Sequence, residues 1–510
     1  DGTAWLEPPF TSGQYTEPES LSCEQDRLAV STSGQSLVVL NQIFHRGWRA
    51  RSAGKDLQTL PVNQVHMGVL VPPGQHDIEL SFRPPGLCSS LLLAGLGWLG
   101  ALLFLGGPRL RSLRQAARAG AGGEDRWMLL PAAAAAIVAS PLVLWPRLLL
   151  NADSYRAYDW LEAAKYRWLA REAWLQEGRL ALWSPWLEGG SPIFAHPGDG
   201  SASPSMLTTL LFGAGPGMKL DALLLLVAGA TGIYALSRRW LRVEPLAAAL
   251  AGTCFAVAGW LPSRLAVGFY ESLWLCIVPW AAVLLLAASR AEGWRQAAPS
   301  LAAASLLLAA AGVQMQLCLA FSFLVLGLWA AAAALLGEPG ERRLPACVGL
   351  AGAGVALLGA VKFLPMLELL QGRGWRVIQS PRIVGNLDAI AGAAAGLFQT
   401  ADAVGAYGPD GQPLVWEYEY GGLPVLAGLA AALGVLAARR RARVPALLLL
   451  LCLGLAWRPG HGYQVSLFEL LRPLPVFESV RATSRYIQFF ALLWACILAG
   501  LGFERALAWA

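Results

Sequence analysis

The chain has 510 residues, of which 56% are hydrophobic and 14% are charged, and its formal net charge at pH 7 is +6. Soluble globular proteins carry about 25% charged residues, so the composition excludes an ordinary soluble protein. Repeated apolar runs of about twenty residues match the thickness of a bilayer core and predict a mainly α-helical, multi-pass membrane protein. The positive charge does not indicate nucleic acid as a partner, because the arginines cluster in short loops between apolar runs.

Residues 1–86 predict a small extracytoplasmic β-sandwich-like domain. Short runs rich in Val, Leu, Ile and aromatic residues are separated by turn sequences such as Ser33-Gly34 and Pro72-Pro73-Gly74. Several short strands with regular turns are typical of a sandwich. The predicted strands are Arg27–Ser31, Ser36–Phe44, Trp48–Arg51, Val65–Val71 and His76–Phe82.

Residues 87–126 predict a first membrane span followed by a cytoplasmic loop that contains five arginines. Because positively charged loops stay on the cytoplasmic side, this loop predicts that the β-domain lies outside. Alternation of spans along residues 127–510 then places every later basic cluster inside as well. About eleven spans are predicted: Leu87–Gly107, Trp127–Leu150, Leu220–Leu236, Pro245–Leu261, Ser272–Ala288, Leu301–Gln314, Leu317–Leu336, Leu344–Leu364, Leu423–Ala438, Pro445–Trp457 and Tyr486–Phe503.

Three external loops, 151–204, 365–422 and 458–485, are predicted to face the same compartment. The first loop begins with Asp153, one or two residues beyond a span. A carboxylate at that depth can accept a proton from an acceptor hydroxyl while a lipid phosphate leaves, so Asp153 is the candidate catalytic residue. Asp153 is also a candidate N-cap for the following segment, for which a helix along the membrane interface is predicted over 157–176. The run Ser205–Phe212 is too short to span and predicts an interfacial or re-entrant piece.

Candidate substrate-binding residues lie mostly in the first loop, where tryptophan rings can stack on sugars. Trp183 and Trp186 have a second interpretation, as belt residues at the headgroup level. The full set of candidates is Asp159, Trp183, Trp186, Glu188, His196 and Gln316.

Four cations near external span ends are candidates for holding a donor phosphate: Arg264, Lys362, Arg481 and Arg485. Arg481 and Arg485 are alternatively ordinary snorkelling residues, although their external position runs against the positive-inside bias. Lys362 lies within an apolar run, where an ionisable residue indicates function. The histidine and cysteine spacings predict no metal site, and no cofactor is predicted with certainty, although a divalent metal stays open.

Several motifs together resemble YfhO-like bacterial membrane proteins, which belong to the broad GT-C glycosyltransferase class. The resemblance covers about residues 127–510 and depends on the order of the motifs. These are Asn151-Ala152-Asp153, Glu177–Pro185, Gly189–Pro192, Ser203-Pro204, Gly312–Gln316, Lys362–Pro365, Tyr418–Gly422 and Pro473–Arg481.

This resemblance implies a polyprenyl-phosphate-linked sugar donor, transfer on the outer face, and Asp153 as the base. In one departure, Val313 or Gln314 replaces a histidine of the family, which implies changed specificity or lost activity. The N-terminal domain resembles the β-domain that normally ends this family. With Asp1 at the start and no Met or signal peptide, the order predicts a segment of a longer tandem protein.

The sequence therefore predicts a bacterial inner-membrane glycosyltransferase that moves a sugar to an envelope glycan or glycopolymer acceptor. Its predicted partners are the lipid bilayer, the polyprenyl-phosphate-linked sugar, the acceptor and other membrane proteins. A non-catalytic GT-C-like subunit of a larger membrane assembly is the alternative. A transporter is a third possibility, but paired Gly/Pro-broken spans in matching halves are not seen.

Overall fold

The computed structural model describes twelve stretches of the chain. They are residues 20–24, 27–62, 66–105, 159–187, 190–258, 260, 264, 269–337, 339–373, 425–456, 470–471 and 484–509.

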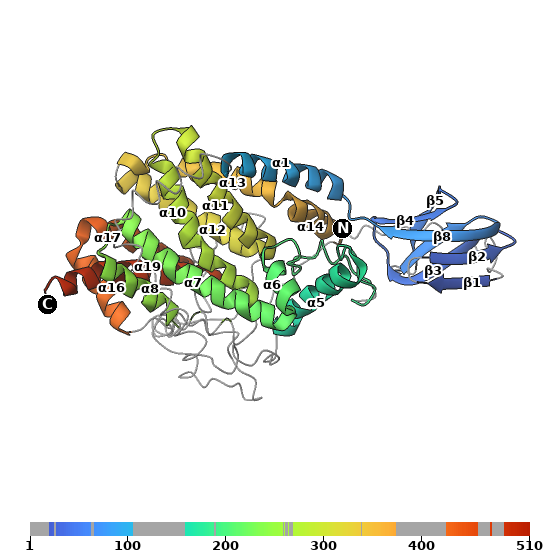
Figure 1. Ribbon diagram of the computed structural model, residues 1–510, viewed down its shortest axis with the longest axis horizontal. Coiled ribbons are helices and arrows are strands. Elements are labelled where there is room, and N and C mark those ends of the chain that lie inside the picture. The colour runs from blue at the N-terminus through green and yellow to red at the C-terminus, as the bar shows by residue number, and fades with distance from the viewer. Residues whose placement is uncertain are drawn as a thin grey trace, which may run out of the picture. The chain divides into compact units, whose positions relative to one another are not determined.

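A small β-domain lies at the N-terminus, as predicted (Figure 1). One sheet has the strand order β1-β2-β8-β4-β5 and the other β3-β7-β6, and all strand pairs are antiparallel. Alternate side chains turn inward, and Leu28, Val38, Met67, Val69 and Ile78 are 0–2% exposed in the core. The strands are β1 Ser20–Glu24, β2 Arg27–Thr32, β3 Ser36–Ile43, β4 Trp48–Ser52, β5 Lys55–Leu57, β6 Thr59–Val62, β7 His66–Val71 and β8 Gly74–Phe82.

Helices make up most of the remaining described residues. They are α1 Leu87–Leu105, α5 Asp159–Glu177, α6 Ser205–Phe212, α7 Ala214–Trp240, α8 Pro245–Ala256, η2 Tyr270–Ile277, α10 Val278–Ser289, α11 Trp294–Gln314, α12 Gln316–Leu336, η3 Pro339–Glu341, α13 Leu344–Leu358, α14 Ala360–Arg373, α16 Val425–Ala437, α17 Arg439–Ala456 and α19 Ser484–Leu507.

Five helical segments of the described chain are long and apolar enough to cross a membrane, so the chain is a multi-pass membrane protein. They are Ala214–Trp240, Tyr270–Ser289, Trp294–Gln314, Gln316–Leu336 and Tyr486–Leu507. Counting the broken pair Pro339–Leu358 and Ala360–Leu369 as one span makes six. The predicted count of about eleven stays a prediction, and the predicted span Trp127–Leu150 lies outside the described residues.

Predicted spans differ from the structure in two places. The span predicted over Pro245–Leu261 contains α8, which ends at Ala256 after 12 residues. The continuous span predicted over Leu344–Leu364 is broken at Gly359, which separates α13 from α14. Gly359 closes the end of α13 by donating its N–H to the carbonyl of Val355 at 2.8 Å. Hydropathy alone does not encode this break, because the residues next to Gly359 on both sides, Val355–Leu358 and Ala360-Val361, are apolar.

Small residues let the membrane helices approach closely, as is usual where hydrophobicity does not drive helices together. Helix α19 packs against α16 and α17 (Figure 1). A Cβ added at Gly502 of α19 would lie 1.8 Å from the carbonyl oxygen of Ala430 in α16. A Cβ at Gly434 would lie 2.2 Å from the carbonyl oxygen of Leu498. Glycine is therefore required on both sides of this helix crossing.

The chain divides into two compact units. The first unit combines the β-domain with two later segments: Asp1–Leu91, Glu172–His196 and Val361–Gly374. The second unit holds most of the helices: Leu92–Arg171, Pro197–Ala360 and Trp375–Ala510.

Candidate functional site

A buried polar cluster centred on Arg167 is the most developed site in the helical unit. Arg167 lies on α5 and its side chain is only 2% exposed. Its guanidinium donates to Ser205 Oγ at 2.7 Å, Thr209 Oγ1 at 2.9 Å and Gln314 Oε1 at 3.0 Å. It also donates to Tyr270 Oη at 3.2 Å and lies over that ring, 4.7 Å from the centroid. One arginine thus connects α5, α6, η2 and α11.

Asp221 supplies the negative charge of this Arg167 cluster. Its Oδ2 lies 3.6 Å from Nη1 of Arg167 and accepts a hydrogen bond from the Tyr270 hydroxyl at 2.7 Å. Its other oxygen accepts from Thr208 Oγ1 at 2.8 Å. The Asp221 side chain is 7% exposed, so both charges of the pair are buried. A buried charge is tolerated only when it is paired and hydrogen-bonded, and both conditions are met here.

The cluster also fixes the loop that leads into α6. Gln314 Oε1 accepts hydrogen bonds from Ser203 Oγ at 3.0 Å and Ser205 Oγ at 3.1 Å. A Cβ added at Gly200 would lie 2.5 Å from the same oxygen, so the loop backbone approaches the amide closely. Asp199, which is fully buried, accepts hydrogen bonds from the backbone and hydroxyl of Ser201.

The geometry of the Arg167 cluster is that of a positioning network. Its guanidinium and carboxylate hydrogen-bond to side chains of the chain itself. The cluster holds the first part of α5 against the helices, and α5 begins six residues after Asp153.

Helix α5 confirms the helix predicted over 157–176. Trp160, Ala163, Tyr166 and Ala170 are 0–4% exposed and form its buried face. The opposite face carries large apolar side chains that are 62%, 55% and 54% exposed, at Leu161, Trp168 and Leu175. Their spacing of seven residues places them on one stripe, which suits a helix that lies along a membrane interface.

Lys362 forms a second buried polar contact, within the unit that contains the β-domain. Its ammonium donates to the carbonyl oxygens of Phe194 at 2.7 Å and His196 at 2.8 Å. The side chain is fully buried. Lys362 therefore holds the end of the predicted first loop through its backbone, and phosphate binding by Lys362 stays a prediction.

The two candidate tryptophans of the first loop occupy different environments. Trp183 packs on the β-domain core, with ring centroids 5.1 Å from Trp48 and 4.6 Å from Phe82. Gly190, at φ 109°, leaves room for that ring. Trp186 is 84% exposed. The structure gives Trp183 a packing role, while sugar stacking by either ring stays a prediction.

Two more candidates lie in the helical unit. The Gln316 side-chain amide nitrogen, at the first residue of α12, is buried without a hydrogen-bond partner in the described part of the chain. A buried amide donor without a partner is costly unless a ligand or water satisfies it. Arg264 is 4% exposed, with its guanidinium 5.9 Å from the ring centroid of Phe269.

The remaining candidates fall partly or wholly outside the described structure. Asp153, Glu188 and Arg481 lie outside the described residues. Asp159 and Arg485 are described as helical residues only, in the first turns of α5 and α19. The described residues contain no group of three His, Cys, Asp or Glu side chains placed to hold a metal ion.

Sequence reasoning missed the four residues that form the centre of the Arg167 cluster: Arg167, Asp221, Tyr270 and Gln314. Asp221 carried a usable signal, because an acidic residue inside an apolar run indicates a buried partner or a function. Gln314 was considered only as a replacement for a histidine, while Gln316 was taken as the ligand.

No protein-family model and no curated protein matches the chain. Among solved structures, it is similar to the archaeal oligosaccharyltransferase AglB from Archaeoglobus fulgidus in complex with an inhibitory peptide and a dolichol-phosphate. That match has 14% identity and a TM-score of 0.38, over 76% of this chain and 50% of the AglB chain. The Archaeoglobus fulgidus oligosaccharyltransferase tethered with an acceptor peptide containing the NVT sequon gives the same identity and TM-score, over 75% and 50%. The chain thus spans about half the length of the solved structures that it matches.

Proposed function

We propose that the chain is a GT-C-type membrane glycosyltransferase that moves a sugar from a polyprenyl-phosphate donor to an envelope acceptor. The main support for this proposal is the buried Arg167–Asp221 ion pair at the membrane helices. Ionisable residues inside such helices are expensive and mark functional regions. This pair holds the helix that follows Asp153, the residue that the YfhO-like motif order assigns as base.

The proposed reaction needs one base and one cation. Asp153 accepts the proton of the acceptor hydroxyl, whose oxygen forms the new bond to the anomeric carbon of the sugar. The bond between that carbon and the phosphate oxygen breaks, and the polyprenyl phosphate leaves with the electron pair. A phosphate is already a good leaving group, so an arginine or lysine that neutralises its charge is sufficient. Arg264, Lys362, Arg481 and Arg485 are the candidates.

The Gln316 amide nitrogen, which has no hydrogen-bond partner among the described residues, supports a polar ligand near the turn between α11 and α12. Asp159, Trp183, Trp186, Glu188 and His196 complete the proposed sugar and acceptor contacts. The proposal includes the finer predictions: about eleven spans, an external β-domain over residues 1–86, YfhO-like membership and a bacterial inner membrane.

A non-catalytic subunit of a membrane assembly is the second candidate function. The observation in its favour is that the Arg167 cluster is satisfied by the chain itself and needs no ligand to be stable.

Release of free polyprenyl phosphate separates the two candidates, because it is measurable without knowing the acceptor. Membranes that contain the full chain would be incubated with synthetic polyprenyl-phosphate hexoses, with membranes lacking it as control. Enzyme-dependent release from one donor is the expected result. No release from any donor, together with purification in a stoichiometric complex, would favour the subunit and contradict the enzyme.

A further inference from the structure

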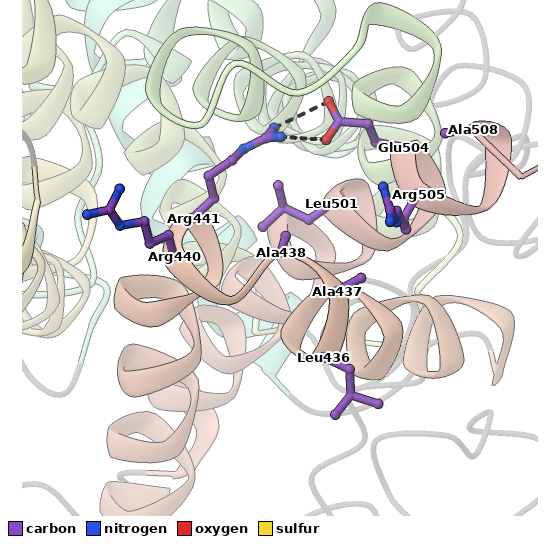
Figure 2. A pocket seen from close by; sticks show the side chains of 9 residues that line it. All are labelled: Leu436, Ala437, Ala438, Arg440, Arg441, Leu501, Glu504, Arg505 and Ala508. Atoms are coloured by element: carbon purple, nitrogen blue, oxygen red, sulfur yellow. Dashed lines mark hydrogen bonds and ion pairs between the residues drawn. The ribbon is translucent and has the colours of Figure 1, made fainter.

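The ends of α16, α17 and α19 line an open pocket of about 560 Å³, at the opposite end of α19 from the candidate Arg485. Its lining includes Leu436, Arg440, Arg441, Leu501, Glu504 and Arg505, and we refer to it as the arginine pocket (Figure 2). Three arginines and one glutamate give the lining a net charge of +2. The cavity is therefore suited to an anion.

One ion pair builds the frame of the arginine pocket. Arg441 donates to both oxygens of Glu504, at 2.7 and 3.3 Å, and to the carbonyl oxygen of Leu241 at 2.9 Å. Glu504 also accepts from the backbone N–H of Glu244 at 3.0 Å. The guanidinium and carboxylate of this pair are thus occupied by contacts within the protein.

Arg440 and Arg505 supply the charge that the frame does not use. Arg440 lies at the start of α17 and Arg505 in the last turn of α19, flanking the Arg441–Glu504 pair (Figure 2). Both side chains are exposed, and within the described part of the chain neither forms an ion pair. The Arg505 guanidinium lies 5.6 Å from the ring centroid of Trp509, which is 65% exposed. Tryptophans of this kind mark the headgroup level of a membrane.

An apolar stripe on α16 leads to the arginine pocket. Leu426, Leu429 and Leu436 are 74%, 64% and 70% exposed. Spacings of three and seven residues place them on one helix face. In a membrane protein such a face contacts acyl chains, and this one ends at Leu436, which also lines the pocket. A free anion would use only the arginines, whereas a lipid would use the arginines and the stripe.

We propose that the arginine pocket binds an anionic glycerophospholipid, with its phosphate beside Arg505, an acyl chain along Leu426, Leu429 and Leu436, and Arg440 adding positive charge from the other side of the pocket (Figure 2). Basic pockets between membrane helices recognise anionic headgroups in this way. A lipid held there would also brace the close crossing of α16 and α19. The site is independent of the proposed glycosyl transfer.

Native mass spectrometry of the purified full chain in detergent tests the proposal, with phosphatidylglycerol and phosphatidylcholine as probes. The variant R440Q/R505Q removes both flanking charges, and R443Q is the matched control, because Arg443 is exposed on α17 but does not line the pocket. Each flanking arginine removed is expected to weaken phosphatidylglycerol binding about five-fold, and the pair about 25-fold. R443Q and phosphatidylcholine binding are expected to be unchanged.

A second variant, Ala437→Trp, and inorganic phosphate as a competitor complete the test. Ala437→Trp fills the cavity with all arginines retained, and it is expected to reduce phosphatidylglycerol binding as R440Q/R505Q does. Equal weakening by R443Q would show general adsorption to basic residues and overturn the proposal. Displacement of the lipid by millimolar inorganic phosphate, or phosphatidylglycerol binding that none of the variants changes, would overturn it as well.

Discussion

Removal of one partner from the buried Arg167–Asp221 pair should destabilise the helical unit strongly. Asp221→Leu leaves the Arg167 guanidinium, 2% exposed, without a counter-charge and the Tyr270 hydroxyl without its acceptor. Breaking a buried pair costs about 3–5 kcal/mol of unfolding free energy, because the remaining charge stays buried. The low exposure of both side chains means that solvent does not screen this loss.

The double variant Arg167→Met/Asp221→Leu should be less damaging than the sum of the single variants. It leaves no unpaired charge, so we expect a coupling energy of about 1–3 kcal/mol in a double-mutant cycle. Tyr270, Gln314 and Thr208 still lose partners, so the double variant should not recover full stability. Reversible unfolding in mixed micelles with increasing sodium dodecyl sulfate, followed by tryptophan fluorescence, measures these differences.

The pair Lys165–Glu162 provides the matched control on the same helix. Its ammonium and carboxylate are 2.7 Å apart, with side chains that are 31% and 55% exposed. Exposed pairs contribute about 0.2–1 kcal/mol, so Lys165→Met should cost less than about 1 kcal/mol. A loss for Lys165→Met as large as for Asp221→Leu, or a coupling energy near zero for the buried pair, would refute the reasoning.

Three further substitutions test contacts that the sequence did not predict. Gly200→Ala should cost about 1–3 kcal/mol of unfolding free energy, because its Cβ would lie 2.5 Å from Gln314 Oε1. Gly293→Ala is the control and should cost little, because no atom lies within 4 Å of its Cβ. Equal effects of the two variants would contradict the close approach of Gly200 to Gln314. Gly502→Ala should lower the melting temperature, because its Cβ would lie 1.8 Å from the carbonyl oxygen of Ala430. The control Gly327→Ala on α12 should leave the melting temperature unchanged or raise it. An unchanged melting temperature for Gly502→Ala would show that α16 and α19 do not cross closely. Trp183→Ala removes the ring that packs on Trp48 and Phe82, so it should speed tryptic cleavage after Arg179. The control Trp186→Ala, at an 84% exposed position, should leave the cleavage rate unchanged. Equal cleavage rates for the two variants would contradict a packing role for Trp183.

The sequence predicted most elements because each has a local signal. The apolar run Leu220–Leu236 lies within α7, and Ser205–Phe212 is the helix α6. Strands β1, β5 and β6 were missed. Strand β1 has five residues with only two apolar side chains, β5 has three residues, two of them charged, and β6 contains Pro61.

The Arg167 cluster could not be predicted from local pattern. Arg167 is separated from Tyr270 by 103 residues and from Gln314 by 147, and only the packing of the helices brings them together. The helix predicted over 157–176 did not indicate which partners Arg167 would contact. The order of the motifs carries the functional prediction, while the contacts of Arg167 required the fold.

The most direct test of the proposed function is the rate of polyprenyl-phosphate release by the Asp153→Asn variant. Glu162→Gln is the matched control, because Glu162 is an exposed carboxylate on α5 that is not among the proposed contacts. A general base contributes about 10²- to 10⁴-fold, so we expect a fall of that size for Asp153→Asn and an unchanged rate for Glu162→Gln. Asp153→Glu, which keeps a carboxylate, should retain part of the rate. An Asp153→Asn variant that folds normally and releases polyprenyl phosphate at the unmodified rate would contradict the assignment of Asp153 as the base.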